Sequence, residues 1–297
     1  MNQPATKAKQ NSRLGAPELS QRKNNTRITM VTAYDATFAR IFDDAGVDAL
    51  LVGDSLGMVI QGHPNTLAVS IDEIIYHCKA VARGSYRAHL VADLPFMSYH
   101  LSTEQTLRNA GRCLSEGQAQ AVKLEGGLRS AKTVEALVNA GIPVMGHVGL
   151  TPQSVHRYGG FRVQGRDPKE ADSIIQDAKA IQDAGAYALV IEAVPEDLAQ
   201  AITESLDIPT IGIGASPTCD GQVLVGYDLL GLSPDPAPRF VKHYSNFFEQ
   251  GIKATARFID DVQHGRFPEM EHTYEKNKKE PSEPSPSKPN LHIVSDT

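Results

Sequence analysis

ALLVGDS, residues 49–55, shows the pattern that decides the fold of this chain. Its apolar run is broken by Gly53, and an aspartate and a serine follow at once. Similar runs recur along the chain, separated by longer amphipathic stretches, and each is typical of a buried strand. The other runs are ITMVTAYD (28–35), HLVADLPF (89–96), AVKLEGG (121–127), PVMGHVGL (143–150), ALVIEAV (188–194), PTIGIGA (209–215) and, as a plausible eighth strand, QVLVGYD (222–228).

The stretches between the runs have helical spacing. Apolar residues recur every three or four positions in 37–46, 71–84 and 170–185, which predicts amphipathic helices. Several stretches stop at a glycine, as at Gly46 and Gly185, which is typical of a left-handed helix end before a strand. Near-continuous apolar strands, each followed by a helix, indicate a parallel sheet covered by helices. Eight such units in roughly 230 residues favour a closed (β/α)8 TIM barrel over an open doubly wound sheet.

Composition divides the chain into three parts. Residues 1–26 are polar and rich in Gln, Asn and Lys, so we expect a mobile arm with at most one short helix. Residues 27–273 form the expected barrel domain, and a helical pattern beyond Phe240 is expected to pack on the barrel or on a neighbouring subunit. Residues 274–297 are predicted to be a disordered tail, because EKNKKEPSEPSPSKPN has four prolines and no aliphatic side chain.

Charge and cysteine content exclude several classes of protein. The net charge of -6 argues against an electrostatic nucleic-acid binder, which normally carries a basic patch. There is no signal-peptide pattern and no run of about 18 apolar residues, so we expect no membrane insertion. The three cysteines are widely spaced and odd in number, which indicates reduced thiols in a cytoplasmic protein.

In a TIM barrel the carboxyl-terminal tips of the strands form the active-site face. A carboxylate there is costly unless it holds a metal or a proton or finds hydrogen-bond donors. An aspartate after a strand is often only the N-cap of the next helix. That explanation suits Asp35, which a helix follows directly, but suits Asp54 less well, since the next helix is expected only near Ser70. The tip residues are Asp35, Asp54, Asp93, Glu125, His147 and Glu192. Because capping explains Asp54, Asp93, Glu125 and Glu192 poorly, we expect a shared polar site at these tips.

The chemistry of these residues narrows the kind of site. Carboxylates with no cysteine and at most one histidine suit Mg2+, which prefers oxygen ligands, better than zinc. Lys123 and Glu125 are two positions apart, so both point to one face of their strand, the barrel interior. Lys123 suits a substrate carboxylate, although a salt bridge to a neighbouring acid is the plain alternative. His147 either donates to substrate or is satisfied by backbone.

Three weaker signals add little. GIGASP (212–217) has proline where a dinucleotide fingerprint needs its third glycine, so NAD is rejected. GGFRVQGR (159–166) is a lid, a site for an anionic part of a substrate, or simply a turn. Cys219 has no histidine base close in sequence, which argues against a nucleophile.

Long motifs, in order, resemble those of the ketopantoate hydroxymethyltransferase (3-methyl-2-oxobutanoate hydroxymethyltransferase) family. The resemblance covers about residues 27–273 and includes the FPEMEHTY ending. It implies a TIM barrel that moves a one-carbon unit from 5,10-methylenetetrahydrofolate to 2-oxoisovalerate, giving ketopantoate for pantothenate and coenzyme A biosynthesis. The motifs are VTAYDATFA, DALLVGDSLGMVIQG, VADLPFMSY, VKLEGG, MGHVGLTPQSVHRYGGFRVQGR, VIEAVP and IGIGASPTCDGQVLV.

The resemblance also implies roles for individual residues. Asp54 and Asp93 would ligate Mg2+, and Glu125 would support the metal directly or through water. The same two aspartates, with Ser55 and Lys123, would form the substrate site, to which His147 is added as a candidate. A large homo-oligomer, often a decamer, is expected.

Glu192 would be the general base, taking the C3 proton of 2-oxoisovalerate to leave a Mg2+-stabilised enolate that attacks the one-carbon unit. The rival enzyme reading is a Mg2+-dependent lyase or mutase of the phosphoenolpyruvate/pyruvate barrel type, which would need no folate. A non-catalytic scaffold barrel is the other alternative, and it would tolerate loss of the tip carboxylates.

Overall fold

The computed structural model describes residues 13–233 and 237–274. The chain forms two compact units, of which the first ends at Asn246 and the second begins at Phe247. In the described part of the chain, no helix is both long and apolar enough to span a membrane.

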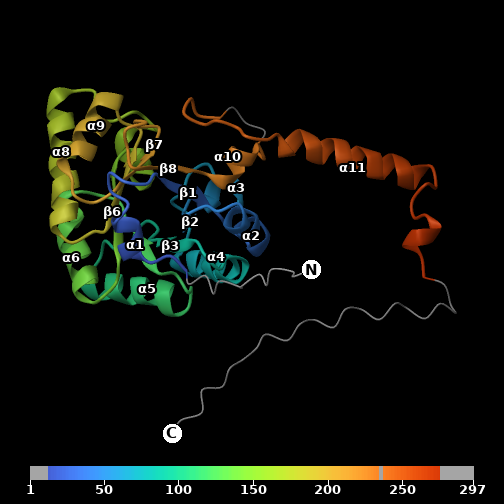
Figure 1. The fold of residues 1–297 in the computed structure, drawn as a ribbon, viewed down its shortest axis with the longest axis horizontal. Coiled ribbons are helices and arrows are strands. Elements are labelled where there is room, and N and C mark those ends of the chain that lie inside the picture. Colours follow the sequence, from blue (N-terminus) through green and yellow to red (C-terminus); the bar gives the residue numbers. More distant parts are fainter. Residues whose placement is uncertain (1–12, 234–236, 275–297) are drawn as a thin grey trace, which may run out of the picture. The chain divides into compact units, whose positions relative to one another are not determined.

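The first unit is a closed barrel of parallel strands in which each strand pairs with its sequence neighbours and β8 closes onto β1 (Figure 1). Every predicted apolar run contains a strand, including the plausible eighth one, so the TIM barrel is confirmed and the open doubly wound sheet is excluded. The strands are β1 (Ile28–Thr32), β2 (Ala49–Val52), β3 (His89–Asp93), β4 (Ala121–Lys123), β5 (Val144–Gly149), β6 (Ala188–Glu192), β7 (Thr210–Ile213) and β8 (Gly221–Leu224).

Helices surround the strands and connect them (Figure 1). The three predicted amphipathic helices are confirmed as α2, α4 and α8. Gly46 and Gly185 both have φ of +94°, the left-handed conformation predicted for their helix ends. The helices of this unit are α1 (Ala16–Ser20), α2 (Ala36–Asp44), α3 (Leu56–Val59), α4 (Ile71–Gly84), α5 (Thr103–Ser115), α6 (Ala131–Asn139), α7 (Val155–Tyr158), α8 (Pro168–Asp183), α9 (Glu196–Ser205) and α10 (Gly226–Leu230), with 3-10 turns η1 (Leu128–Ser130) and η2 (Pro152–Ser154).

Two apolar layers hold the barrel together. One lies between the sheet and the helices, and the other fills the barrel interior. Because side chains alternate along a strand, the residue two positions after an interior one points inward as well, one step nearer the carboxyl-terminal face. The interior residues Val91, Ala121, Met145 and Val190 are followed in this way by Asp93, Lys123, His147 and Glu192. The strands therefore place these four polar side chains directly above the apolar interior.

Residues 13–26 pack against the amino-terminal end of the barrel, so the expected mobile arm is wrong for this part. The side chain of Leu19, on α1, is 1% exposed and belongs to the interior apolar cluster. The guanidinium of Arg13 donates to the backbone oxygen of Ser85 over 2.6 Å. Burial of one large apolar side chain outweighs the polar character of the segment. Residues 1–12 of the predicted arm lie outside the described residues.

The second unit contains α11 (Phe247–Gln263) and the 3-10 turn η3 (Met270–His272). The helix predicted beyond Phe240 is therefore present. The expected barrel domain, 27–273, crosses the boundary between the two units at Asn246. Its continuation to residue 273 stays a prediction. The predicted disordered tail lies, from Glu275 onward, outside the described residues.

Candidate active site

Asp35 is a helix cap and not part of the site. Its carboxylate accepts hydrogen bonds from the backbone N–H groups of Thr37 and Phe38, at 2.7 and 2.9 Å, at the start of α2. This is the local explanation that the sequence favoured for Asp35. The remaining tip residues lie at the carboxyl-terminal ends of β2 to β6.

Asp54 and Ser55 follow β2, and Ser55 occupies the N-cap position of α3 without a capping hydrogen bond from its side chain. The prediction that the next helix waits until Ser70 is wrong, because the single-turn helix α3 starts directly after Ser55; Ser70 instead caps α4. The Ser55 hydroxyl makes no cap hydrogen bond and lies 2.9 Å from the Tyr34 hydroxyl. Asp54 is 5% exposed. Both side chains are thus left for a role other than capping.

Gly53 keeps open the space between these residues and β3. A Cβ at this position would lie 3.2 Å from the Ser55 hydroxyl oxygen and 3.5 Å from Asp93 Oδ2. Because Gly53 has no side chain, a small space remains between the Ser55 hydroxyl and the Asp93 carboxylate.

A row of four side chains crosses the barrel from β3 to β6. Lys123 Nζ lies 2.9 Å from Asp93 Oδ1 and 3.2 Å from His147 Nδ1. A lysine ammonium can only donate, so Nδ1 of His147 accepts and its Nε2 carries the proton. That Nε2 lies 3.1 Å from Glu192 Oε2. Each residue stands on the strand next to its partner's, so the barrel order itself aligns the row.

Gln153 is a site residue that the sequence analysis missed. It lies in η2 after β5 and is 5% exposed. Its Nε2 donates to Asp54 Oδ2 over 2.9 Å, and its backbone N–H donates to Glu125 Oε2 over 3.1 Å. Its Oε1 accepts from the Tyr99 hydroxyl over 2.8 Å. Only its place four residues after the end of β5 hinted at this role.

Burial dominates the electrostatics of the site. Burial, and then the charge of Asp93, raises the pKa of Asp54 to about 7. Burial raises the pKa of Glu192 to about 7, although the charge of Lys123 opposes the shift. Burial alone would lower the pKa of Lys123, but neighbouring carboxylates, led by Asp93, outweigh it and raise the pKa. Burial, followed by the charge of Lys123, holds the pKa of His147 well below its usual range, so the ring is neutral.

The donor set suits a hard cation. Asp93 Oδ1 is buried and, despite its short distance to Lys123, has no aligned hydrogen bond. Asp54 and Asp93 offer carboxylate oxygens only, the donors that Mg2+ prefers. Among the described residues, no three His, Cys, Asp or Glu side chains converge into a complete ligand set. The pair of Asp54 and Asp93 fits Mg2+, which is often bound through one or two carboxylates with substrate and water as its other ligands.

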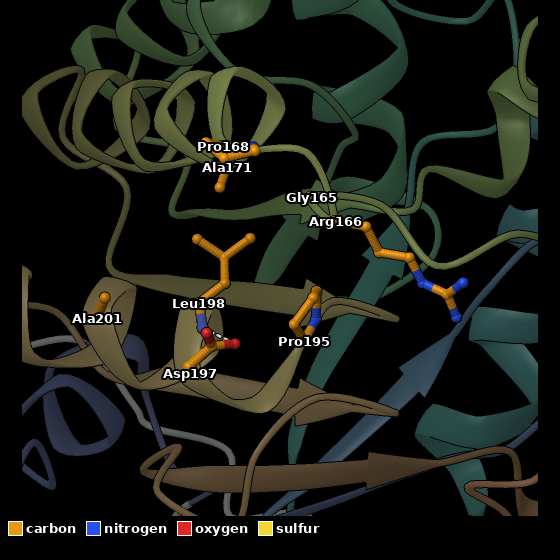
Figure 2. A pocket seen from close by; sticks show the side chains of 8 residues that line it. All are labelled: Gly165, Arg166, Pro168, Ala171, Pro195, Asp197, Leu198 and Ala201. Carbon is orange, nitrogen blue, oxygen red and sulfur yellow. Dashed lines mark hydrogen bonds between the residues drawn. The ribbon is translucent and has the colours of Figure 1, made fainter.

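A cavity of about 420 Å³ lies between the starts of α8 and α9. Figure 2 shows Leu198 and Ala171 facing each other across it, with Arg166 extending away from both. Gly165 packs closely, since a Cβ there would lie 2.3 Å from Leu198 Cδ2. None of the predicted site residues lines this cavity; it is bounded by Gly165, Arg166, Pro168, Ala171, Pro195, Asp197, Leu198 and Ala201.

All three cysteines are buried and unpaired, as the sequence predicted. Cys219 contacts the Thr203 hydroxyl, at 3.8 Å, on the far side of β7 from the carboxylates. This location agrees with the view that it is not a nucleophile.

Residues 13–270 match the family model described as ketopantoate hydroxymethyltransferase. The chain is 54% identical over 256 residues to the 3-methyl-2-oxobutanoate hydroxymethyltransferase of Pelobacter propionicus, covering 86% of this chain and 95% of that protein. It is 54% identical over 266 residues to the enzyme of the same name from Moorella thermoacetica, covering 89% and 99%.

Solved structures with a similar fold belong to other enzymes. A phosphoenolpyruvate phosphomutase from Streptomyces platensis subsp. rosaceus has a TM-score of 0.58 at 15% identity, covering 85% of this chain and 88% of that one. A 2,3-dimethylmalate lyase of the PEP mutase/isocitrate lyase superfamily has a TM-score of 0.56 at 14% identity, covering 89% and 91%. These likenesses confirm the expected phosphoenolpyruvate/pyruvate type of barrel at the level of the fold.

Proposed function

The chain belongs to the ketopantoate hydroxymethyltransferase family, an enzyme family whose product is ketopantoate, and we propose that its barrel transfers the one-carbon unit of 5,10-methylenetetrahydrofolate to 2-oxoisovalerate with the help of Mg2+. Membership favours this reaction over the lyase or mutase alternative. The observation that carries the assignment of roles is the row of side chains from Asp93 to Glu192 beside the buried Asp54.

The 2-oxo acid is held at the β2 and β4 tips. Lys123 is a buried cation with a raised pKa, so it stays charged and can donate to an oxygen of the substrate. Ser55 can donate as well, because the Tyr34 hydroxyl is able to donate to Ser55 Oγ, which leaves the Ser55 hydrogen for the substrate. Asp54 and Asp93 would hold Mg2+, which when bound would polarise the 2-oxo group and make the C3–H more acidic. Glu125, whose Oε2 accepts from the Gln153 backbone, supports this arrangement at its edge.

Glu192 takes the proton from C3. A pKa raised to about 7 gives its carboxylate a base strength suited to neutral pH. His147 is neutral and protonated at Nε2, which lies 3.1 Å from Oε2 of Glu192, although the two atoms are not aligned for a hydrogen bond. We therefore give His147 the task of orienting the base. The electron pair left on C3 forms a bond to the methylene carbon as one of its two carbon–nitrogen bonds to the folate breaks. A water molecule replaces the second nitrogen and supplies the oxygen of the product's hydroxyl group. Tetrahydrofolate leaves, its two nitrogens having taken up the C3 proton and one proton of the water.

Deuterium exchange at C3 of 2-oxoisovalerate, measured without folate and with or without Mg2+, tests these roles. We expect Mg2+-dependent exchange in the parent protein. Glu192→Gln should keep binding of Mg2+ and 2-oxoisovalerate but lose exchange. Glu196→Gln is the matched control, since this exposed glutamate lies four positions further along, at the start of α9, and should exchange like the parent. Normal C3 exchange in Glu192→Gln would show that Glu192 is not the base.

Folate dependence separates the transferase from the lyase or mutase reading, because only the transferase needs methylenetetrahydrofolate for turnover. A scaffold barrel would show neither turnover nor exchange. Assembly into a large homo-oligomer, often a decamer in this family, belongs to the proposal and is tested by sedimentation. Location in the cytoplasm stays a prediction from the sequence.

A further inference from the structure

A cavity of about 360 Å³ opens onto the candidate active site from the side of β3 to β5. Glu125 and Gln153 line it, so its wall includes the two residues that hold the edge of the carboxylate cluster. Its volume falls in the usual range for small-molecule sites. A ligand in this cavity would lie next to the 2-oxo acid at Asp54 and Lys123.

One wall of the cavity is aromatic. The rings of Phe96 and His100 lie 5.8 Å apart between centroids, and the rings of Tyr99 and His100 lie 4.1 Å apart. Phe96 is 39% exposed although it follows a strand whose other side chains are buried. Burial, and then the charge of Arg129, lowers the pKa of His100, which favours a neutral ring able to stack. Such a wall suits a flat heterocycle.

Another part of the lining is basic. Arg129 and Arg157 are exposed, and within the part of the chain that the structure describes neither forms an ion pair. Arg129 has only a long contact, 3.4 Å, to the Ser154 hydroxyl. Two unpaired guanidinium groups beside one cavity are notable in a chain with a net charge of -6. They offer bidentate donors to carboxylates.

We propose that this cavity binds the folate co-substrate, with the pteridine and aminobenzoyl rings along Phe96 and His100 and the glutamate tail at Arg129 and Arg157. The inference rests on the proposed function. A flat ring system joined to an anionic tail matches an aromatic wall beside two free arginines. The 2-oxo acid is too small to need this cavity, and its negative carboxylate already has a positively charged partner in Lys123.

The cavity of Figure 2 is the competing location on the same face of the barrel. It has one arginine, Arg166, but also the carboxylate of Asp197, and none of the carboxylate cluster lines it. In that cavity the negative glutamate tail of the folate would be repelled by Asp197. The one-carbon unit would have no residue of the carboxylate cluster beside it. Arg166 is therefore a matched control for Arg157, since both are exposed arginines beside a cavity.

Steady-state kinetics of the full chain with both substrates test the proposal. Arg157→Ala should raise the KM for methylenetetrahydrofolate by about tenfold, the effect of one lost charge-assisted hydrogen bond. Its KM for 2-oxoisovalerate and its folate-free C3 exchange should equal those of the parent. Phe96→Ala should give the same pattern, and Arg166→Ala should change none of the three quantities.

A co-substrate without the glutamate tail, methylenetetrahydropteroate, sharpens the test. The parent should bind it at least as weakly as Arg157→Ala binds the folate, since the tail also loses Arg129, and Arg157→Ala should add no further loss. The proposal is overturned if Arg157→Ala and Phe96→Ala both leave the folate KM within twofold of the parent, or if Arg166→Ala raises it equally. If the parent shows C3 exchange but no folate-dependent turnover, the proposed function itself fails, which is a different result.

Discussion

Replacing Gln153 by leucine should weaken Mg2+ binding by about 10- to 100-fold. The Gln153 amide donates to Asp54 over 2.9 Å and to the backbone oxygen of Leu94 over 3.0 Å, and so holds the carboxylate in one orientation. A hydrogen bond to a charged group contributes about 1.5–3 kcal/mol, and loss of a residue that orients a metal ligand commonly costs about 10–100-fold in affinity. The Tyr99 hydroxyl also loses the nearer of its two acceptors and keeps only the Glu125 backbone oxygen at 3.3 Å, so stability should fall by about 1–3 kcal/mol.

Titration calorimetry with Mg2+ in the presence of 2-oxoisovalerate measures the affinity, and urea unfolding measures the stability. Gln164→Leu is the control, because Gln164 is a buried glutamine on the same face whose amide donates only to the backbone oxygen of Arg162. It should lose stability but keep Mg2+ affinity. The reasoning is refuted if Gln153→Leu binds Mg2+ within twofold of the parent, or if both variants lose the same affinity.

Three further predictions concern the metal, a cap and the response to acid. Asp54→Ala should abolish Mg2+-dependent binding of 2-oxoisovalerate in calorimetry; equal affinity with and without Mg2+ would remove Asp54 as a ligand. Asp35→Ala should lower the free energy of unfolding by about 1 kcal/mol, through loss of the α2 cap, with unchanged turnover; a large loss of turnover would contradict its exclusion from the site. His89 is buried, and this burial lowers its pKa from 6.5 to about 4. The stability that neutral His89 contributes is therefore complete above pH 6.5 and is lost as the pH falls toward 4, by about 3 kcal/mol in all. Urea unfolding at several pH values should show this slope in the parent and not in His89→Gln; an equal slope in both would assign the acid sensitivity elsewhere.

Local patterns predicted much of the fold. The apolar runs were recognisable because strands buried on both faces need no polar alternation, and the helices because their apolar residues repeat with the helical period. Asp35 shows a success of purely local reasoning, since its partners Thr37 and Phe38 lie within three residues. The segment around Leu19 shows a failure, because its polar composition concealed one side chain that packs against the barrel.

The candidate site was partly predictable for the same reason. Lys123 and Glu125 were expected inside the barrel from their spacing, and the interior position of Ala121 agrees with this for Lys123. The short helix after Ser55 was missed, since a single turn of four residues has too little periodicity to detect.

By itself, the sequence determined that this chain is a barrel with a polar carboxyl-terminal face. The spacing of apolar residues in a strand or a helix is a local property, so it can be read from residues that are close along the chain. It also identified the family, through long motifs in a constant order. Only the tertiary structure decided which polar residues meet. Gln153 and Asp54 are 99 residues apart and bond because closure of the barrel brings the ends of β2 and β5 to one face. The row from Asp93 to Glu192 likewise exists only because β3 to β6 lie side by side, since contacts between side chains depend on distances of a few ångströms that no separation along the chain encodes.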